Sequence, residues 1–131
     1  MSVNILGHLL PGDLLERPKG PVTHMGIYLG NGRVLHNTPG YGEHETSFSE
    51  FVKDKEVAVY QPPQYMRDHI LHNASAVLAD PKQYFLLTNN CEHTVRRIVE
   101  EQSYSRQLII WGLIATTLIG TIYLLRKAII K

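Results

Sequence analysis

The chain has 131 residues, with 13 Lys and Arg against 12 Asp and Glu and a formal net charge of +1. A balance this close to neutral excludes the basic excess that nucleic-acid binding requires. The single cysteine excludes an intrachain disulfide, which argues against a disulfide-stabilised secreted domain. The charge is unevenly spread, because residues 1–107 carry a net −2 and the remainder carries only basic charges. The length leaves room for one compact domain of about 105 residues with its own core.

The first part of the chain is typical of β-strands separated by turns. Pro11-Gly12 is a turn signal before a short strand at residues 13–16. The strongest signal is a hairpin, in which residues 25–29 and 33–36 flank Gly30-Asn31-Gly32. Residues 56–60 predict a further strand that ends at Pro62-Pro63.

Helices are predicted mainly in the second part. Ser47 and Glu50 have the spacing of a capping box, which predicts a short helix through Val52. Apolar residues at helical spacing predict a helix over residues 65–79. A further helix is expected to start at Asn89 or Asn90 and to continue through Val99. Because the strands come first and the helices follow, the fold class is α+β with a small antiparallel sheet packed on helices.

Residues 108–125 form an uncharged apolar run that predicts a membrane-spanning helix. A buried core helix is the alternative, although an all-round apolar helix suits lipid better than so small a domain. The predicted organisation is a catalytic domain at 1–104 and a C-terminal anchor with a basic tail at 105–131. Arg106 and Arg126-Lys127 bracket the run, so the positive-inside rule does not decide its orientation. Because no N-terminal export signal is visible, we expect a single-pass membrane protein with a cytoplasmic domain.

Cys91 is a candidate nucleophile, although a lone cysteine is often only a small buried hydrophobic residue. The preceding asparagines can cap a helix, which places Cys91 in the first turn, where the helix dipole favours the thiolate. A thiolate also requires a proton acceptor, which is usually histidine.

The chain offers seven histidines for this role. His69 and His72 are three residues apart on a predicted helix but have no further ligand at useful spacing, so we expect a solvated face and no metal. His8 and His44 lie in loop-like sequence without a functional signal, and His93 is expected to be structural because it points to a different face of the helix from Cys91.

The hairpin links His24 to His36, and its loop decides whether they share a face. A two-residue Asn31-Gly32 loop would pair residue 36 with residue 27 and place the two histidines on opposite faces. A three-residue loop with Gly32 in the left-handed conformation would instead pair His36 with Gly26 and place both histidines on one face. The turn chemistry allows the second arrangement, whereas two unrelated strand histidines remain the alternative.

Two sequence boxes resemble those of the lecithin retinol acyltransferase-like proteins, the family that includes the phospholipase A/acyltransferases. The segment from His24 to His36, preceded by Gly12–Glu16, is similar to the histidine box of this family. Residues Asn90-Cys91-Glu92-His93 are similar to its asparagine-cysteine box, and Tyr84 matches a tyrosine of that motif.

The resemblance implies a circularly permuted papain-like fold, in which the histidine precedes the cysteine. It implies that Cys91 is the nucleophile, His24 the general base and His36 the group that orients His24. Tyr84 or Asn90 would support the oxyanion or the site around it. The expected function is a membrane-anchored thiol acyltransferase or phospholipase acting on phospholipid or other acyl-ester lipids without a cofactor. A papain-like peptidase or amidase, and a non-catalytic membrane protein that retains the fold, are the alternatives.

Overall fold

A five-stranded antiparallel sheet forms the centre of the protein. The computed structural model describes residues 5–100 and 106–129. The strands lie in the order β4-β3-β2-β1-β5, so that β2 is central and β4 and β5 are the edges. Their bounds are Leu14–Lys19 for β1, Val22–Gly30 for β2, Arg33–Thr38 for β3, Gly42–Ser47 for β4 and Ala58–Tyr60 for β5.

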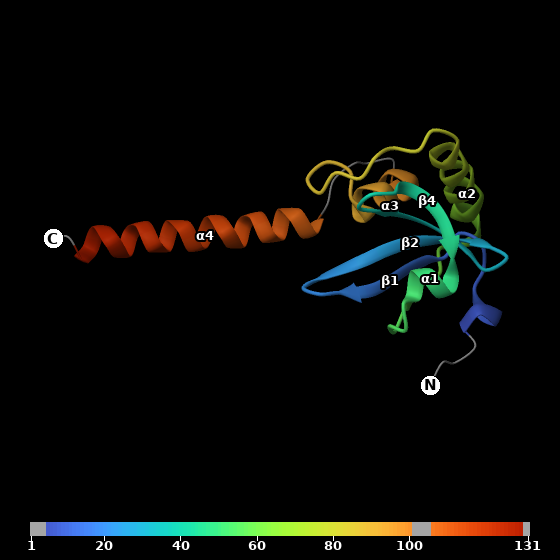
Figure 1. Ribbon diagram of the computed structural model, residues 1–131, viewed down its shortest axis with the longest axis horizontal. Coiled ribbons are helices and arrows are strands. Elements are labelled where there is room, and N and C mark those ends of the chain that lie inside the picture. Colours follow the sequence, from blue (N-terminus) through green and yellow to red (C-terminus); the bar gives the residue numbers. More distant parts are fainter. Residues whose placement is uncertain (1–4, 101–105, 130–131) are drawn as a thin grey trace.

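Three helices belong to the compact part of the molecule. They are α1 at Phe48–Val52, α2 at Gln64–Ala79 and α3 at Cys91–Glu100. In Figure 1, α2 and α3 lie on one side of the sheet and α1 lies on the other. Ser47 is the N-cap of α1, and its side chain accepts a hydrogen bond from the Glu50 N–H, as the capping pattern predicts.

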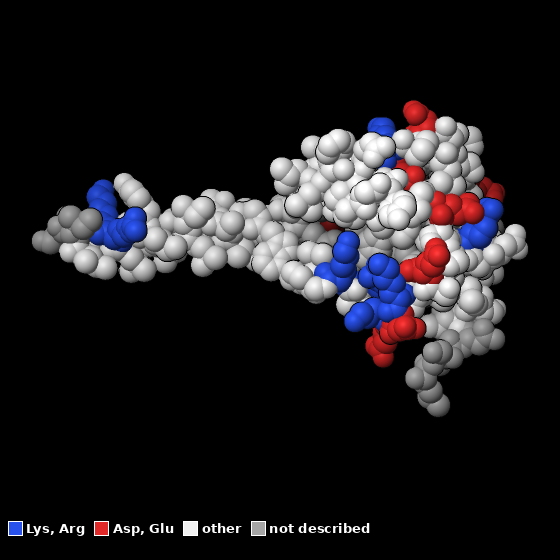
Figure 2. All heavy atoms as spheres, viewed as in Figure 1, with Lys and Arg blue, Asp and Glu red and all other residues white. Residues whose placement is uncertain are grey.

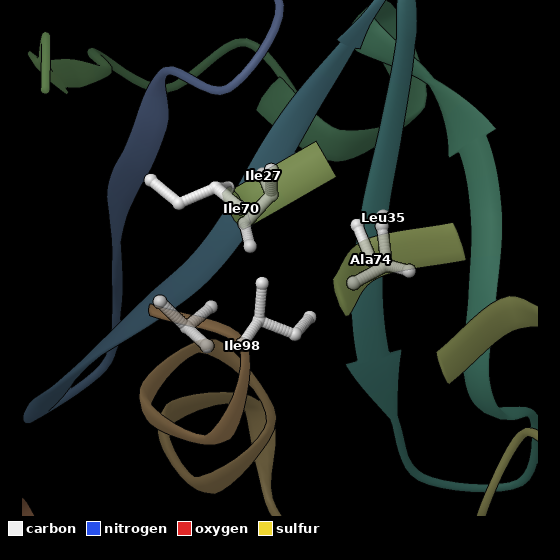
Figure 3. Close-up of a cluster of buried hydrophobic side chains, with 6 residues drawn as sticks. Ile27, Leu35, Ile70, Ala74 and Ile98 are labelled. Carbon is white, nitrogen blue, oxygen red and sulfur yellow. The ribbon is translucent and has the colours of Figure 1, made fainter. Parts of the chain in front are cut away.

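The two faces of the sheet bury different side chains. The face toward α2 and α3 is aliphatic, with Ile27 and Leu35 of the sheet packed against Ile70, Ala74 and Ile98 of the helices (Figure 3). The opposite face packs against α1 through a second cluster, which consists of Leu9, Leu15, Tyr28, Val34 and Phe51. Successive residues of a strand point to opposite faces, so β2 and β3 contribute to both clusters.

Helix α4, Arg106–Ile129, extends away from the compact part (Figure 1). Its residues Gln107–Ile129 are long and apolar enough to cross a membrane, and none of the most apolar stretch is buried. Its Thr116, Thr117 and Thr121 hydroxyls each donate to the carbonyl four residues earlier, which satisfies them within the helix. Figure 2 shows no acidic or basic side chain along the visible shaft of α4 before its basic end.

The predicted α+β class and small antiparallel sheet are confirmed, and the predicted helices agree with α1, α2 and α3 to within a residue or two. Strand β4 was not predicted, because its sequence Gly-Glu-His-Glu-Thr-Ser is polar and lacks the apolar alternation of a half-buried strand. The predicted domain boundary at residues 104 and 105, and the last basic residue, Lys131, lie outside the described residues.

Candidate functional site

The hairpin of β2 and β3 places His24 and His36 on the same face of the sheet. Gly26 pairs with His36 and Ile27 with Leu35, as the predicted register requires. Of the two loops considered, the two-residue one forms, because Gly30 pairs with Arg33 and the loop contains only Asn31 and Gly32, both with positive φ. A bulge between Tyr28 and Gly30 supplies the missing residue and restores the register that a two-residue loop alone would have shifted.

The two imidazoles are in direct hydrogen-bond contact inside the protein. Nε2 of His24 lies 2.9 Å from Nδ1 of His36, and both side chains are buried. Phe51 of α1 packs against both rings, with centroid separations of 5.4 Å from His24 and 5.6 Å from His36. Gly26 makes this packing possible, because a Cβ at this position would lie 2.8 Å from both Phe51 and Val34.

Burial keeps both histidines neutral. It lowers the pKa of His24 to about 3, with further contributions from His36 and from the positive charge of Arg17, its cross-strand neighbour. Burial likewise lowers the pKa of His36 to about 3, and the neighbouring His44 adds to the effect. At neutral pH, His24 is therefore an imidazole with one nitrogen able to accept a proton.

Cys91 begins α3, as predicted, and Asn90 is the residue that caps this helix. The Asn90 side-chain oxygen accepts a hydrogen bond from the His93 N–H at 3.1 Å. In return, Nδ1 of His93 accepts the Asn90 backbone N–H at 3.3 Å, which resembles a capping box with histidine in place of glutamate. His93 is thus part of the helix cap, and Cys91 lies in the first turn.

The Cys91 sulfur lies against the backbone on both sides of His24. Its thiol donates to the Thr23 carbonyl at an S···O distance of 3.9 Å, and the Met25 N–H hydrogen-bonds the same sulfur. This edge of β2 is open because β3 no longer pairs with β2 beyond the Gly26–His36 pair. Because the pairing of β2 with β3 ends here, the first turn of α3 can place Cys91 against β2, the strand that carries His24.

The Cys91 thiol is protonated at rest. Burial raises its pKa above the ordinary value, and the hydrogen bonds from Met25 and Glu92 and the charge of Lys19 only partly oppose this. Because the His24 imidazole is also neutral, the site holds a neutral thiol beside a neutral base.

A pocket of about 270 Å³ connects the cysteine to the start of α4. His24, Cys91, Tyr84 and Asn90 line it together with Leu86 and with Gln107, Leu108 and Trp111 of α4. The Gln107 side chain accepts from the Thr23 N–H at 2.9 Å and donates to the Thr23 carbonyl at 3.3 Å. Burial and the nearby Cys91 raise the pKa of the Tyr84 phenol, which keeps its hydroxyl protonated.

The predicted residues Cys91, His24, Tyr84 and Asn90 thus share one pocket, and His36 lies directly behind His24. No sequence pattern indicated Phe51, because its packing role depends on contacts between α1 and the sheet that no local pattern encodes. The expectation that His44 lies in a loop without a functional signal is wrong, because His44 lies on β4 opposite His36. Among the described residues, no group of three or more metal-ligating side chains exists, and His69 and His72 are exposed on α2.

No model of a known protein family matches the chain. Among curated proteins, the chain is similar to phospholipase A and acyltransferase 1 of Homo sapiens, with 27% identity over 129 residues. The aligned region covers 81% of this chain and 76% of the human protein. This distant homologue supports a relationship to lipid acyltransferases and phospholipases.

Proposed function

We propose that this protein is a membrane-anchored thiol acyltransferase or phospholipase that acts on lipid acyl esters. The observation that carries the proposal is the docking of the Cys91 sulfur against Thr23 and Met25, the two residues that flank His24. The distant human homologue, named as a phospholipase A and acyltransferase, supports the lipid substrate class. In this proposal the fold is a circularly permuted papain-like one, with the histidine strand ahead of the cysteine helix.

The proposed reaction has two steps. Nδ1 of His24, the ring nitrogen not bonded to His36, takes the thiol proton while the Cys91 sulfur attacks the ester carbonyl carbon. The tetrahedral intermediate collapses, the bond to the ester oxygen breaks, and that oxygen takes the proton from His24 as the lysolipid leaves. Water, or an acceptor amine or hydroxyl, then attacks the acyl-thioester with His24 again as base, and the Cys91 thiol is restored.

Other pocket residues have supporting roles in this proposal. His36 holds the His24 ring through the 2.9 Å hydrogen bond and stabilises the imidazolium formed during attack. The Tyr84 hydroxyl, kept protonated by its raised pKa, and a backbone N–H at the start of α3 are the proposed donors for the oxyanion. Asn90 keeps that first turn in place as the helix cap.

Because α4 lines the pocket and is the candidate membrane helix, the pocket would open near the lipid surface. Leu108 and Trp111 of α4 line the pocket beside Leu86, so its apolar wall continues into the candidate membrane helix. Phe85, Leu86 and Leu87, just before the asparagine-cysteine box, are all more than half exposed. Such a run of exposed apolar side chains next to an apolar helix suits contact with a bilayer. An acyl chain could then reach Cys91 without passing through water.

The test is acyl transfer to the protein from phosphatidylcholine vesicles, measured on the full chain by mass spectrometry. We expect a fatty-acyl adduct on Cys91 in the unmodified protein and none in Cys91→Ser. His24→Gln should slow adduct formation by a factor of at least about 100, the usual contribution of a general base. His72→Gln, which changes an exposed histidine on α2, is the matched control and should acylate normally.

Three outcomes would contradict the proposal. An adduct that survives in Cys91→Ser would assign the chemistry to another residue. Faster cleavage of peptide than of lipid substrates would favour a peptidase. No adduct in the unmodified protein, under conditions where it remains folded and bound to vesicles, would indicate a non-catalytic membrane protein.

A further inference from the structure

His44 extends the histidine pair into a chain of three imidazoles. His44 lies directly opposite His36 in the β3–β4 register, and the two Nε2 atoms are 3.1 Å apart. On its other side, Nδ1 of His44 lies 2.9 Å from the Gly42 carbonyl oxygen. A continuous hydrogen-bonded path therefore runs from a backbone carbonyl through His44 and His36 to His24.

The carbonyl at the end of the path determines where every proton lies. A carbonyl oxygen only accepts, so Nδ1 of His44 must carry a hydrogen and Nε2 of neutral His44 is an acceptor. His36 must then donate from Nε2, which leaves its Nδ1 as the acceptor for the Nε2 hydrogen of His24. The reverse arrangement would place two lone pairs against each other at Gly42.

We propose that His44 is a positioning residue that fixes the tautomers of His36 and His24, so that the free lone pair of His24 is on Nδ1. This inference rests on the proposed function, because the lone pair on Nδ1 is the one that would accept the Cys91 proton. When Nδ1 of His24 accepts that proton, the Nε2 hydrogen of His24 stays where it is and is still donated to Nδ1 of His36, so the chain needs no rearrangement. A wrong tautomer of a catalytic histidine is costly, as the triad of serine proteases illustrates.

The same proton count predicts how the chain fails. A side chain at position 44 that can only donate would donate to Nε2 of His36. That reversal would move the hydrogen of His36 to Nδ1, so that His36 donates to Nε2 of His24. His24 would then carry its own hydrogen on Nδ1 and could no longer act as a base toward Cys91. A donor in place of the acceptor at position 44 would therefore inactivate the site.

The surroundings of His44 include a cavity and several charged groups. Its ring is partly exposed at a cavity on the side of His36 away from His24, and Tyr41 stacks near it at a centroid distance of 5.5 Å. The charged groups facing the chain come from three elements and one loop: Arg17 and Lys19 of β1, Glu45 of β4, Glu50 of α1 and Lys53 after α1. Glu45 pairs with Arg33 and Glu50 accepts from Thr46, so the carboxylates are engaged elsewhere.

Three substitutions at position 44 separate positioning from simple packing. His44→Gln keeps an acceptor for His36, His44→Phe keeps a ring without an acceptor, and His44→Lys presents only a donor. We expect His44→Gln to retain most of the wild-type kcat. His44→Phe should lower kcat by a factor of about 10 or more with little change in KM, and His44→Lys should be worse. His72→Gln serves as the control and should leave kcat and KM unchanged.

The direct readout is the tautomeric state of each ring, measured by two-bond 1H–15N correlation spectra of full-length protein labelled with 15N-histidine in lipid nanodiscs. We expect Nε2–H on His24 and His36 and Nδ1–H on His44, with loss of the single His24 tautomer in His44→Phe. This measurement needs no turnover, so it tests the proton chain even if the proposed acyl transfer fails. An unchanged His24 tautomer in His44→Phe would overturn the inference, as would an Nδ1–H tautomer on His24 of the wild type.

Discussion

Strands β2 and β3 contribute side chains to both faces of the sheet, but the two faces bury different kinds of group. Ile27 and Leu35 point into the aliphatic cluster between the sheet and the helices α2 and α3. Their immediate neighbours, Gly26 and His36, point to the other face, where two buried histidines lie against Phe51. The aliphatic face gains stability from apolar burial, whereas the histidine face buries polar groups that must remain uncharged. Stability and chemistry can thus be perturbed separately by substitutions one residue apart.

Acid should affect the histidine face most strongly. Unfolded histidine takes up a proton near pH 6.5, whereas folded His24 and His36 have pKa values of about 3, so the unfolded state binds more protons below pH 6.5. Lowering the pH from 7 to 5 should reduce the free energy of unfolding by about 2 kcal/mol for each histidine, about 4 kcal/mol together.

Urea denaturation at several pH values measures this dependence. The double variant His24→Asn/His36→Asn should show a much flatter dependence between pH 7 and 5, whereas His72→Gln should keep the wild-type slope. If the double variant loses as much stability as the wild type between pH 7 and 5, groups other than these two histidines cause the acid sensitivity.

Truncation on the aliphatic face should be the next largest effect. Ile98 is fully buried between α3 and the sheet, so Ile98→Ala should reduce the free energy of unfolding by about 3 kcal/mol through lost burial and a residual cavity. Below the unfolding transition, the acylation rate of folded protein should stay near wild type. A large loss of rate in fully folded Ile98→Ala would show that the two faces are coupled.

Gly26→Ala, which adds one methyl group, should test how tightly the histidine face is packed. The Cβ of Gly26→Ala would meet Phe51 and Val34 at 2.8 Å and the Leu35 carbonyl oxygen at 3.1 Å. Because these neighbours are buried, we expect a loss of about 2 kcal/mol in unfolding free energy from overpacking and, in addition, a displaced histidine pair. Thermal unfolding and acylation assays check the two effects, and Gly26→Ala/Phe51→Leu should recover part of both. Wild-type stability in Gly26→Ala would contradict the packing argument.

A surface change near the pocket should have the smallest effect on stability. Leu87 is 72% exposed in the segment before the asparagine-cysteine box. Leu87→Asp should change the unfolding free energy by less than about 0.5 kcal/mol, as surface substitutions usually do. The rate on anionic and zwitterionic vesicles should nevertheless fall several-fold if this segment contacts lipid, while the rate on a soluble short-chain ester should not. Equal rates on vesicles would exclude this segment from the membrane contact.

The sequence predicted the parts of the site that depend on near neighbours along the chain. The capping asparagine placed Cys91 in the first turn of α3, since a cap and the turn it starts are encoded within four residues. The apolar run predicted the helix of α4 for the same kind of local reason. The glycine-rich turn allowed the register in which His36 pairs with Gly26, although a bulge rather than a longer loop produces it.

Tertiary structure decided which distant groups meet. Strand β4 exists because its polar residues pair with β3 and because Glu43 binds the Lys82 N–H and Arg97, which lie 39 and 54 residues away in the chain. That pairing makes His44 the partner of His36, and the open edge of β2 makes Thr23 and Met25 the partners of Cys91. By itself, then, the sequence determined which residues could do chemistry and which segment could lie in a membrane. Only the fold decided how the histidines are connected, because hydrogen bonds between strands depend on register and on strand ends, and neither is a property of any one segment.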